Sequence, residues 1–470
     1  MTTNMLKAAI LALVNFMVTI GFSLLAPAFF FVGILGLSLL VPELVIDTTF
    51  LTLYFLIMCT GYNGILMFVL GFGRLEHGED TAHYFSIIIP AHNEESVIGE
   101  TLQQVIEMNY PSELFEVIVV NDGSTDNTER VVQNFQMEHS TVKLINIPPM
   151  NGGFGKGPAL NVGFIDFLFT WRGLEIEPRH RWIIGVFDAD GHPQADMLRK
   201  VSYEFRDPRV GGVQTLVRIR NRGTSFLAKL QDIEFIAFSR VIQFSRTFFK
   251  GSVALGGNGQ FIRATALDTV TSPRTEQCWN VKSLTEDLDM GIRLSMEKWE
   301  MRYVGSTACE QEGVETIRSL VRQRTRWSWG TLQALKQYIL GLRFLRARVS
   351  LKKKVDTSIY LLNIIVPFLV LLCLVLTGMS FLGLISISNI FPFSFTLANG
   401  FSYLPFYFFG LWKERNEYPF WQILPLTVIA TMYTYHWIPC ITSAIIKAIT
   451  QKPVWVKTPR FNHIRERGGL

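Results

Sequence analysis

The 470-residue sequence is poor in charged residues, since Asp, Glu, Lys and Arg make up only 18% of it. Soluble proteins average about 25%, and 49% of this chain is hydrophobic, so disordered and collagen-like classes are excluded. The chain also lacks paired cysteines: its five cysteines form no CxxC motif and no zinc-binding spacing. Its formal net charge of +5 is too small to indicate nucleic acid as a partner.

Long stretches without any Asp, Glu, Lys or Arg are the clearest positive feature. A charged side chain at the centre of a bilayer costs at least ~2.5 kcal/mol, and about 20 apolar residues are enough to cross it. Four stretches exceed that length, namely residues 8–42, 48–73, 357–412 and 418–446. They predict an N-terminal transmembrane region at 1–73 with about two spans, and a C-terminal region at 357–446 with three or four.

A basic stretch precedes the third of these runs. Six Lys and Arg residues fall between Arg343 and Lys354, and cations beside a span favour the cytoplasmic side of the membrane. We therefore expect an integral protein of the cytoplasmic membrane in contact with membrane lipids. Residues 74–313 form its cytosolic domain, residues 314–356 form amphipathic interfacial helices, and residues 447–470 form a cytosolic tail.

The cytosolic domain alternates between strand and helix patterns. Short β-rich runs are followed by apolar residues at helical spacing over 94–108, and by a second helix that Ser124 or Thr125 can cap and that continues to about Met137. This order predicts a mostly parallel sheet with helices on both faces and ligands at the carboxyl ends of the strands. The predicted strands are 84–90, 115–120, 143–147 and 182–187.

Acidic residues follow two of these strands. Asp122 follows one, and Asp188 and Asp190 follow another. Carboxylates at positions i and i+2 can turn toward one hard cation, such as Mg²⁺ or Mn²⁺, with substrate phosphates completing its coordination. The alternative reading of each is a solvated aspartate in a turn.

Two further clusters have a structural as well as a functional reading. Glu286 and Asp287 precede a helical pattern, where acidic residues also act simply by favouring a helix start. The segment Gln323–Trp327 lies in a longer stretch, 314–340, in which cations and aromatic residues alternate. That pattern is typical of an interfacial helix, which does not exclude a binding site.

These motifs resemble, in their order along the chain, those of family 2 glycosyltransferases. More narrowly, they look like the membrane-embedded processive synthases of cellulose, chitin, hyaluronan and poly-N-acetylglucosamine. The resemblance covers about residues 84–330 and departs at Asn121, where many relatives carry a second Asp. It implies a GT-A-like α/β domain with a mixed, mostly parallel sheet, inserted between α-helical transmembrane segments. The motifs that carry it are IPAHNE (89–94), VNDGSTD (120–126), KGPALN (156–161), DAD (188–190), TED (285–287) and QRTRW (323–327).

The resemblance also implies roles for individual residues. Asp287 would be the general base, with Glu286 beside it. The nucleotide sugar would be bound by Asp122 and Lys156, and by Asp188 and Asp190 through Mg²⁺ or Mn²⁺. The acceptor and pyrophosphate would be bound by Gln323, Arg326 and Trp327. A gating segment in the tail would contribute Trp455, Lys457, Thr458 and Arg460.

The expected function is inverting, processive transfer from UDP-glucose or UDP-N-acetylglucosamine to a growing β-glycan, which the protein moves across the membrane. The alternative is a membrane glycosyltransferase that adds one sugar to a lipid carrier. Part of the donor pocket is expected at Gly256–Gln260, where glycines permit close approach of the backbone. The sequence contains no sizeable regulatory domain, so regulation or export would need a separate subunit.

Overall fold

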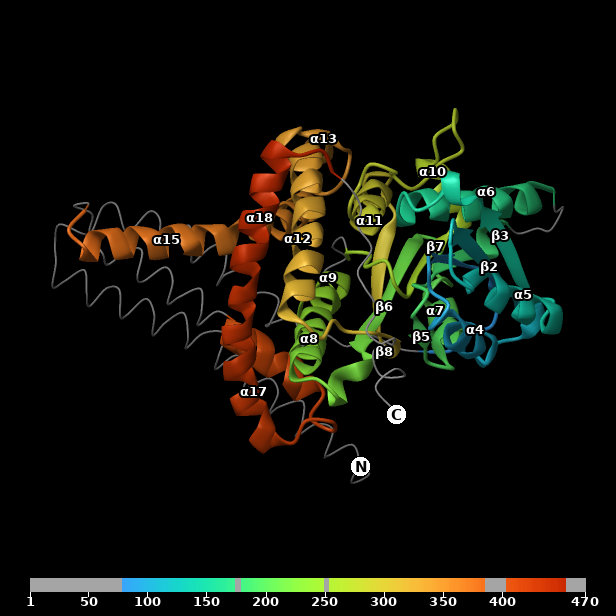
Figure 1. The fold of residues 1–470 in the computed structure, drawn as a ribbon. Coiled ribbons are helices and arrows are strands. Elements are labelled where there is room, and N and C mark those ends of the chain that lie inside the picture. Colours follow the sequence, from blue (N-terminus) through green and yellow to red (C-terminus); the bar gives the residue numbers. More distant parts are fainter. Residues whose placement is uncertain (1–77, 174–178, 249–252, 385–402, 454–470) are drawn as a thin grey trace, which may run out of the picture. The chain divides into compact units, whose positions relative to one another are not determined.

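The computed structural model describes residues 78–173, 179–248, 253–384 and 403–453 (Figure 1). The chain divides into two compact units. One comprises Glu76–Phe235, Lys250–Leu361 and Ser443–Leu470, and the other comprises Met1–Leu75, Ile236–Phe249 and Leu362–Thr442. All strands of the sheet belong to the first unit, which we call the catalytic unit.

The catalytic unit is built on an eight-stranded mixed sheet in the order β3-β2-β1-β4-β7-β6-β8-β5. Four strands pair in parallel, and β7 then pairs antiparallel with both β4 and β6. β6 and β8 run parallel, and β5 is antiparallel to β8. A mixed, mostly parallel sheet is therefore confirmed. The strands are β1 Tyr84–Ala91, β2 Phe115–Asp122, β3 Val142–Ile147, β4 Trp182–Val186, β5 His192–Pro193, β6 Val210–Ile219, β7 Gln260–Arg263 and β8 Glu300–Gln311.

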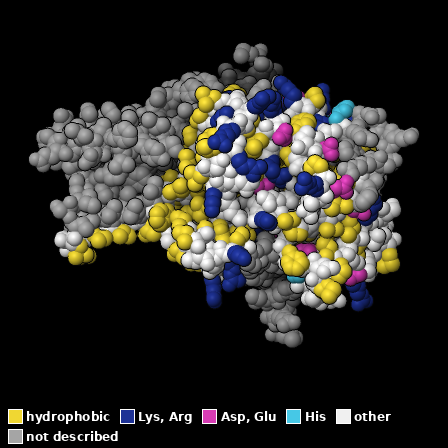
Figure 2. Space-filling view, turned by 90° about the horizontal axis from the view of Figure 1, so that it is seen from above, with side chains coloured by type: hydrophobic (Ala, Val, Ile, Leu, Met, Phe, Trp, Pro, Cys, Tyr) yellow, Lys and Arg dark blue, Asp and Glu magenta, His cyan; other side chains and the backbone are white. Residues whose placement is uncertain are grey.

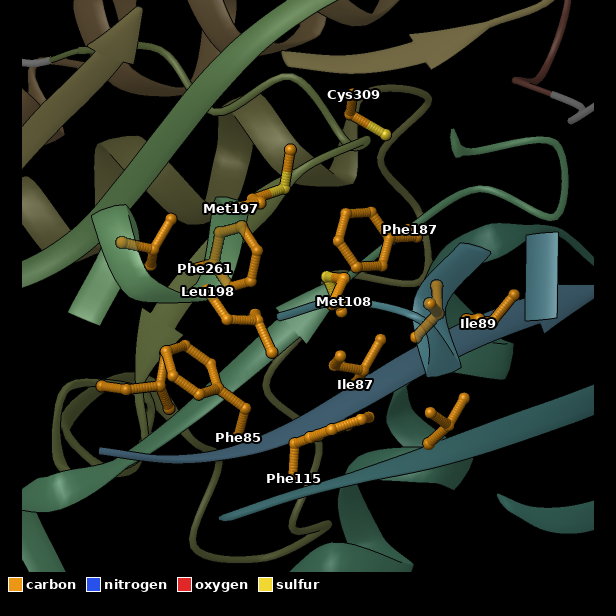
Figure 3. Packing of buried hydrophobic residues seen from close by; sticks show 14 of the residues in the cluster. Phe85, Ile87, Ile89, Met108, Phe115, Phe187, Met197, Leu198, Phe261 and Cys309 are labelled. Carbon is orange, nitrogen blue, oxygen red and sulfur yellow. The ribbon is translucent and has the colours of Figure 1, made fainter. Parts of the chain in front are cut away.

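Helices cover both faces of this sheet. Successive strand residues point to opposite faces, so one strand can pack against helices on both sides. On one face, Phe85, Ile87 and Ile89 pack with residues of helices α4 and α7 in the buried cluster of Figure 3. On the other face, Gly163 of α6 lies against Ile88 and Val120. The helices of this unit are α4 Ile98–Ile106, α5 Thr128–Glu138, α6 Lys156–Gly173, α7 Met197–Glu204, α8 Phe226–Ala237, α10 Ala264–Val270, α11 Glu286–Met296, α12 Ile317–Ala334, α13 Arg343–Arg346 and α14 Leu351–Leu362.

Two of the predicted helices begin later than the sequence pattern indicates. α4 begins at Ile98, because residues 94–97 form a turn. α5 begins at Thr128, so the prediction that Ser124 or Thr125 caps it is wrong. The Ser124 hydroxyl instead accepts a hydrogen bond from the backbone N–H of Asn93 at 2.9 Å, which links the loops after β1 and β2.

The second unit contains helices α9 Phe244–Phe248, α15 Val366–Phe381 and α17 Phe420–Tyr433, and α18 Trp437–Thr450 begins in it. Buried polar contacts join its segments. Arg240 donates to Glu414 at 2.5 Å, and the hydroxyls of Tyr407 and Thr434 are 2.7 Å apart. Within the ranges that the structure describes, no helix combines the length and the apolar character needed to cross a membrane. The predicted spans in residues 1–73 lie outside those ranges.

Candidate active site

The functional residues predicted after the strands lie at the carboxyl ends of β2 and β4, as a parallel arrangement requires. Asp122 is the last residue of β2 and is buried. Its Oδ1 accepts a hydrogen bond from the backbone N–H of Gly153 at 3.0 Å. Burial raises the pKa of this carboxyl, and the hydrogen bond from Gly153 partly offsets the effect.

The loop after β3, which contacts Asp122, requires glycine at position 152. A Cβ at Gly152 would lie 2.6 Å from the backbone nitrogen of Gly123, so a side chain there would force the loop away from β2. The imidazole of His92, in the loop after β1, is 2.6 Å from the carbonyl oxygen of Asp122. The three loops after β1, β2 and β3 therefore meet around Asp122.

Lys156, the first residue of α6, connects these loops to the acidic residues of the site. Its ammonium forms an ion pair with Asp188 and donates a hydrogen bond to the carbonyl oxygen of Gly257 at 2.6 Å. Burial alone would lower the pKa of Lys156, but the carboxylates of Asp188, Glu286 and Asp287 outweigh it, so the pKa is raised. The lysine is therefore charged and neutralises an acidic cluster.

Asp188 and Asp190 have different partners within the protein. Asp188 pairs with Lys156, and its side chain is 35% exposed. Asp190 is buried and accepts a hydrogen bond from the backbone N–H of Glu312 at 3.1 Å. No cluster of three or more metal-ligating side chains occurs among the residues that the structure describes. Carboxylate oxygens from the partly exposed Asp188 and the buried Asp190 are nevertheless a donor type that suits Mg²⁺ or Mn²⁺ when phosphates supply further ligands.

Glu286 and Asp287 form the first turn of α11. Burial, reinforced by the neighbouring Asp287, raises the pKa of Glu286 to about 7. Burial also raises the pKa of Asp287, against the opposing effects of Lys156 and Arg326. The helix has no side-chain hydrogen bond at its N-cap. Glu286 is buried and Asp287 partly buried, so the pair is more than a helix-capping device, and one of the two carboxyls is available to take up a proton near neutral pH.

Gly257 allows the strand end and α11 to approach each other. Its φ is +77°, a conformation that favours glycine. A Cβ at this position would lie 3.0 Å from Oδ2 of Asp287 and 3.2 Å from Nζ of Lys156. Next to it, the side-chain Oδ1 of Asn258 accepts a hydrogen bond from the backbone N–H of Asp188 at 3.2 Å. The predicted segment Gly256–Gln260 thus contacts the acidic cluster.

The QRTRW motif lies on α12, as its helical pattern predicts. The positive charge of Arg326 acts on both carboxyls of α11 and partly offsets the rise in their pKa values. Its buried Nε has no hydrogen-bond partner in the described part of the chain, so it remains available as a donor. Gln323 and Trp327 both contact Arg324, whose guanidinium donates to Oε1 of Gln323 at 3.2 Å and lies 4.0 Å from the ring centre of Trp327.

No role for Arg324 or for its ion-pair partner Glu234 follows from the sequence. The sequence of an amphipathic helix does not show which tertiary contacts an arginine in it makes. Asp289 belongs to the same acidic cluster in the sequence as Glu286 and Asp287, but the sequence assigns it no role; it accepts hydrogen bonds from Tyr338 at 2.7 Å and from Arg293 at 2.8 Å. The bond from Tyr338 links α11 to the π-helical turn Leu335–Leu340 that follows α12, whereas the bond from Arg293 lies within α11. The proposed gating residues Trp455, Lys457, Thr458 and Arg460 lie outside the described residues.

Comparison with known proteins agrees with this architecture. Residues 82–330 match the model of a family described as glycosyltransferase like family 2. The chain belongs to this family, whose enzymes transfer a sugar from a nucleotide-sugar donor.

Among its relatives is the beta-monoglucosyldiacylglycerol synthase of Synechocystis sp., 32% identical over 383 residues that cover 79% of this chain and 74% of that protein. A poly-beta-1,6-N-acetyl-D-glucosamine synthase of Staphylococcus epidermidis is 26% identical over 60% of this chain and 61% of that protein. The fold is similar to a mannosyltransferase of Pyrobaculum calidifontis in complex with GDP-Man and Mn²⁺, with a TM-score of 0.54, 16% identity, and coverage of 86% of this chain and 97% of that one.

Proposed function

We propose that this enzyme transfers a single sugar from a UDP-hexose to a lipid acceptor, as a non-processive, inverting β-glycosyltransferase. The observation that carries the proposal is the similarity to a glucolipid synthase over 79% of the chain. Similarity to a polysaccharide synthase covers only 60% and is weaker. Processive synthesis, which the QRTRW motif favours on its own, is therefore the second candidate. The relatives' names suggest glucose as the sugar and diacylglycerol as the acceptor.

The acidic pair on α11 supports the chemistry. In a single displacement, one carboxylate removes the proton from the acceptor hydroxyl while that oxygen attacks the anomeric carbon, which inverts its configuration. Asp287 is the proposed base, and burial, with a smaller contribution from Asp188, raises its pKa. Lys156 and Arg326 are both close enough to act electrostatically on Asp287, and these two cations can bind the negatively charged diphosphate.

Asp188 and Asp190 are the residues that would hold a divalent cation. Mg²⁺ or Mn²⁺ bound there would neutralise part of the charge that develops on the leaving diphosphate. Asp188 would exchange its bond with Lys156 for one with the cation. Lys156, still close to Asp287 and Gly257, would then be free to bind a phosphate oxygen.

The surface around α13 supports a location at the cytoplasmic membrane. Exposed apolar side chains alternate there with exposed cations, a combination typical of segments that bind an anionic membrane surface. α13 lies near the top of the view in Figure 1, and Figure 2 shows Lys and Arg side chains gathered on the face seen from above. We propose that this face approaches the membrane and that the uncharged terminal runs anchor the protein in it. The residues concerned are Leu340, Leu342, Arg343, Arg346, Arg348, Leu351, Lys352 and Val355.

The test uses purified protein in liposomes that contain diacylglycerol, with Mg²⁺ or Mn²⁺ and either radiolabelled UDP-glucose or UDP-N-acetylglucosamine. A product that extracts into organic solvent and carries one sugar per lipid supports the proposal, provided that Asp287→Asn does not form it. A water-soluble, high-molecular-weight product that glycosidases degrade would refute it in favour of polymer synthesis. Addition of EDTA to the same reaction tests the proposed need for a divalent cation.

A further inference from the structure

Arg324 lies at the centre of a buried group of residues where α12 packs against α8, helices that lie side by side in Figure 1. The arginine has no exposed surface. Its Nη2 donates to Oε2 of Glu234 at 2.8 Å, and its Nη1 donates to Oε1 of Gln323 at 3.2 Å. Its guanidinium lies over two aromatic rings, 4.0 Å from the ring centre of Trp327 and 5.6 Å from that of Phe235.

A buried guanidinium requires a physical reason, because removing a charge from water is costly unless it is paired. Glu234 supplies the opposite charge. Arg324 also contacts Gln323 and Trp327, two of the three motif residues expected to bind acceptor and pyrophosphate. Arg324 thus holds both of these side chains at once.

Only arginine can make all of these contacts. The planar guanidinium forms an ion pair and a hydrogen bond in its own plane while its flat face stacks on an indole. A lysine at this position would keep the charge but could not stack as a plane or bind two partners in a fixed geometry. Phe235 completes the arrangement with a T-shaped contact to Trp327, their ring centres 6.2 Å apart.

We propose that Arg324, anchored by Glu234, is a positioning residue that fixes Gln323 and Trp327 in the orientation needed to bind the acceptor. The proposal rests on the proposed function insofar as it names the acceptor side of the site. Most of the expected donor contacts lie elsewhere, since Lys156, Asp122 and Asp188 have no contact with this group among those described above. Arg326 can still bind the pyrophosphate when Gln323 and Trp327 are displaced.

The competing explanation is purely structural, in which Arg324 only joins α12 to α8. The two explanations differ in kinetics. A structural role predicts loss of stability with donor and acceptor affected alike, whereas a positioning role predicts a selective loss of acceptor binding. Arg302 serves as a control for the loss of an arginine ion pair, because it forms partly buried pairs, donating to Glu204 at 3.1 Å and to Asp207 at 2.6 Å, with no contact to the motif residues among those described.

The experiment compares Arg324→Lys, Glu234→Asp and Arg302→Lys in the full-length enzyme in liposomes. We expect Arg324→Lys to raise the KM for the lipid acceptor about tenfold, the effect of losing a desolvated cation–π contact and its hydrogen bond. The KM for the nucleotide sugar should stay within about twofold, since few donor contacts change. Glu234→Asp keeps the negative charge but shortens the side chain that pairs with Arg324. It should therefore also raise the acceptor KM, by a smaller factor than Arg324→Lys.

The outcomes separate the two proposals. An unchanged acceptor KM in Arg324→Lys, together with a melting temperature lowered as in Arg302→Lys, would overturn the positioning role. A parallel rise in both KM values would also overturn it. If the wild-type enzyme makes polymer and no glycolipid, the proposed function fails while this inference does not, and the same comparison is made with a glycan acceptor.

Discussion

Gly330 of α12 can be used to test whether the packing of α12 fixes the position of the acidic pair Glu286 and Asp287. This glycine lies three residues beyond Trp327 and packs against Thr285, which precedes Glu286 at the start of α11. A Cβ at Gly330 would lie 2.5 Å from both Cγ2 and Oγ1 of Thr285. Carbon atoms in contact are normally 3.5–4.0 Å apart, so Gly330→Ala should displace the start of α11 by about 1 Å.

The expected effect on rate is larger than the effect on stability. A displacement of about 1 Å in a catalytic group reduces rates on the order of 100-fold, so we expect a loss of that size in kcat. Overpacking costs about 1–3 kcal/mol, and the better helix propensity of alanine returns up to ~1 kcal/mol. Gly330→Ala should therefore lower the melting temperature by only a few degrees.

The measurement is kcat under saturating donor and acceptor, with melting temperature recorded in parallel. Thr285→Ala provides a partial rescue. It removes the two nearest atoms and leaves only the Thr285 Cβ, at 2.9 Å, and the hydroxyl it removes has no hydrogen-bond partner in the part of the chain described. The control is Gly223→Ala, where a Cβ would meet nothing within 4 Å. Wild-type kcat in Gly330→Ala, or a loss that Thr285→Ala leaves unrelieved, would refute this reasoning.

Three further predictions concern charge. Lys156→Met leaves the surrounding carboxylates without their cation, so the KM for donor should rise at least about tenfold; an unchanged donor KM would contradict the role of Lys156. Because burial raises the pKa values of Glu286, to about 7, and of Asp287, kcat/KM should fall as the pH drops below about 7; a flat profile between pH 5.5 and 8 would argue against this pair. Burial lowers the pKa of His83 to about 4 in the folded protein. At pH 5 this histidine is therefore protonated mainly in the unfolded chain, so the free energy of unfolding should fall by about 2 kcal/mol from pH 7.5 to 5. His83→Gln should reduce this loss, which denaturant titration can check.

The sequence alone was enough to predict the first part of the fold. β1 and β2 are short apolar runs, and their strand character is a local property, so each begins where predicted. The positions of Asp122 and Asp188 at the ends of strands follow from that. β7 was not predicted: it has only four residues, Gln260–Arg263, and it pairs antiparallel with both neighbours because of the chain's overall path.

The contacts within the candidate site were less predictable. Lys156 and Asp188 are 32 residues apart, and the motifs gave both a role but not their ion pair. The contacts of Gly330 with Thr285 and of Arg324 with Glu234 depend on how α12 packs, which no local pattern encodes. Motif order predicted which residues form the site, whereas the tertiary structure was needed to see which of them contact one another.

Gly257 also restricts how this site can change in evolution. Its positive φ disfavours every other residue, a Cβ would crowd both Asp287 and Lys156, and its carbonyl oxygen already binds the lysine. Gly256, one position earlier, has no such φ, and its Cβ would lie at an ordinary 3.5 Å from the Gln214 amide. In a library of random substitutions, functional clones should therefore retain glycine at 257 and admit alanine at 256. Substitutions that change the substrate preference would therefore have to occur at positions near Gly257 and not at Gly257 itself.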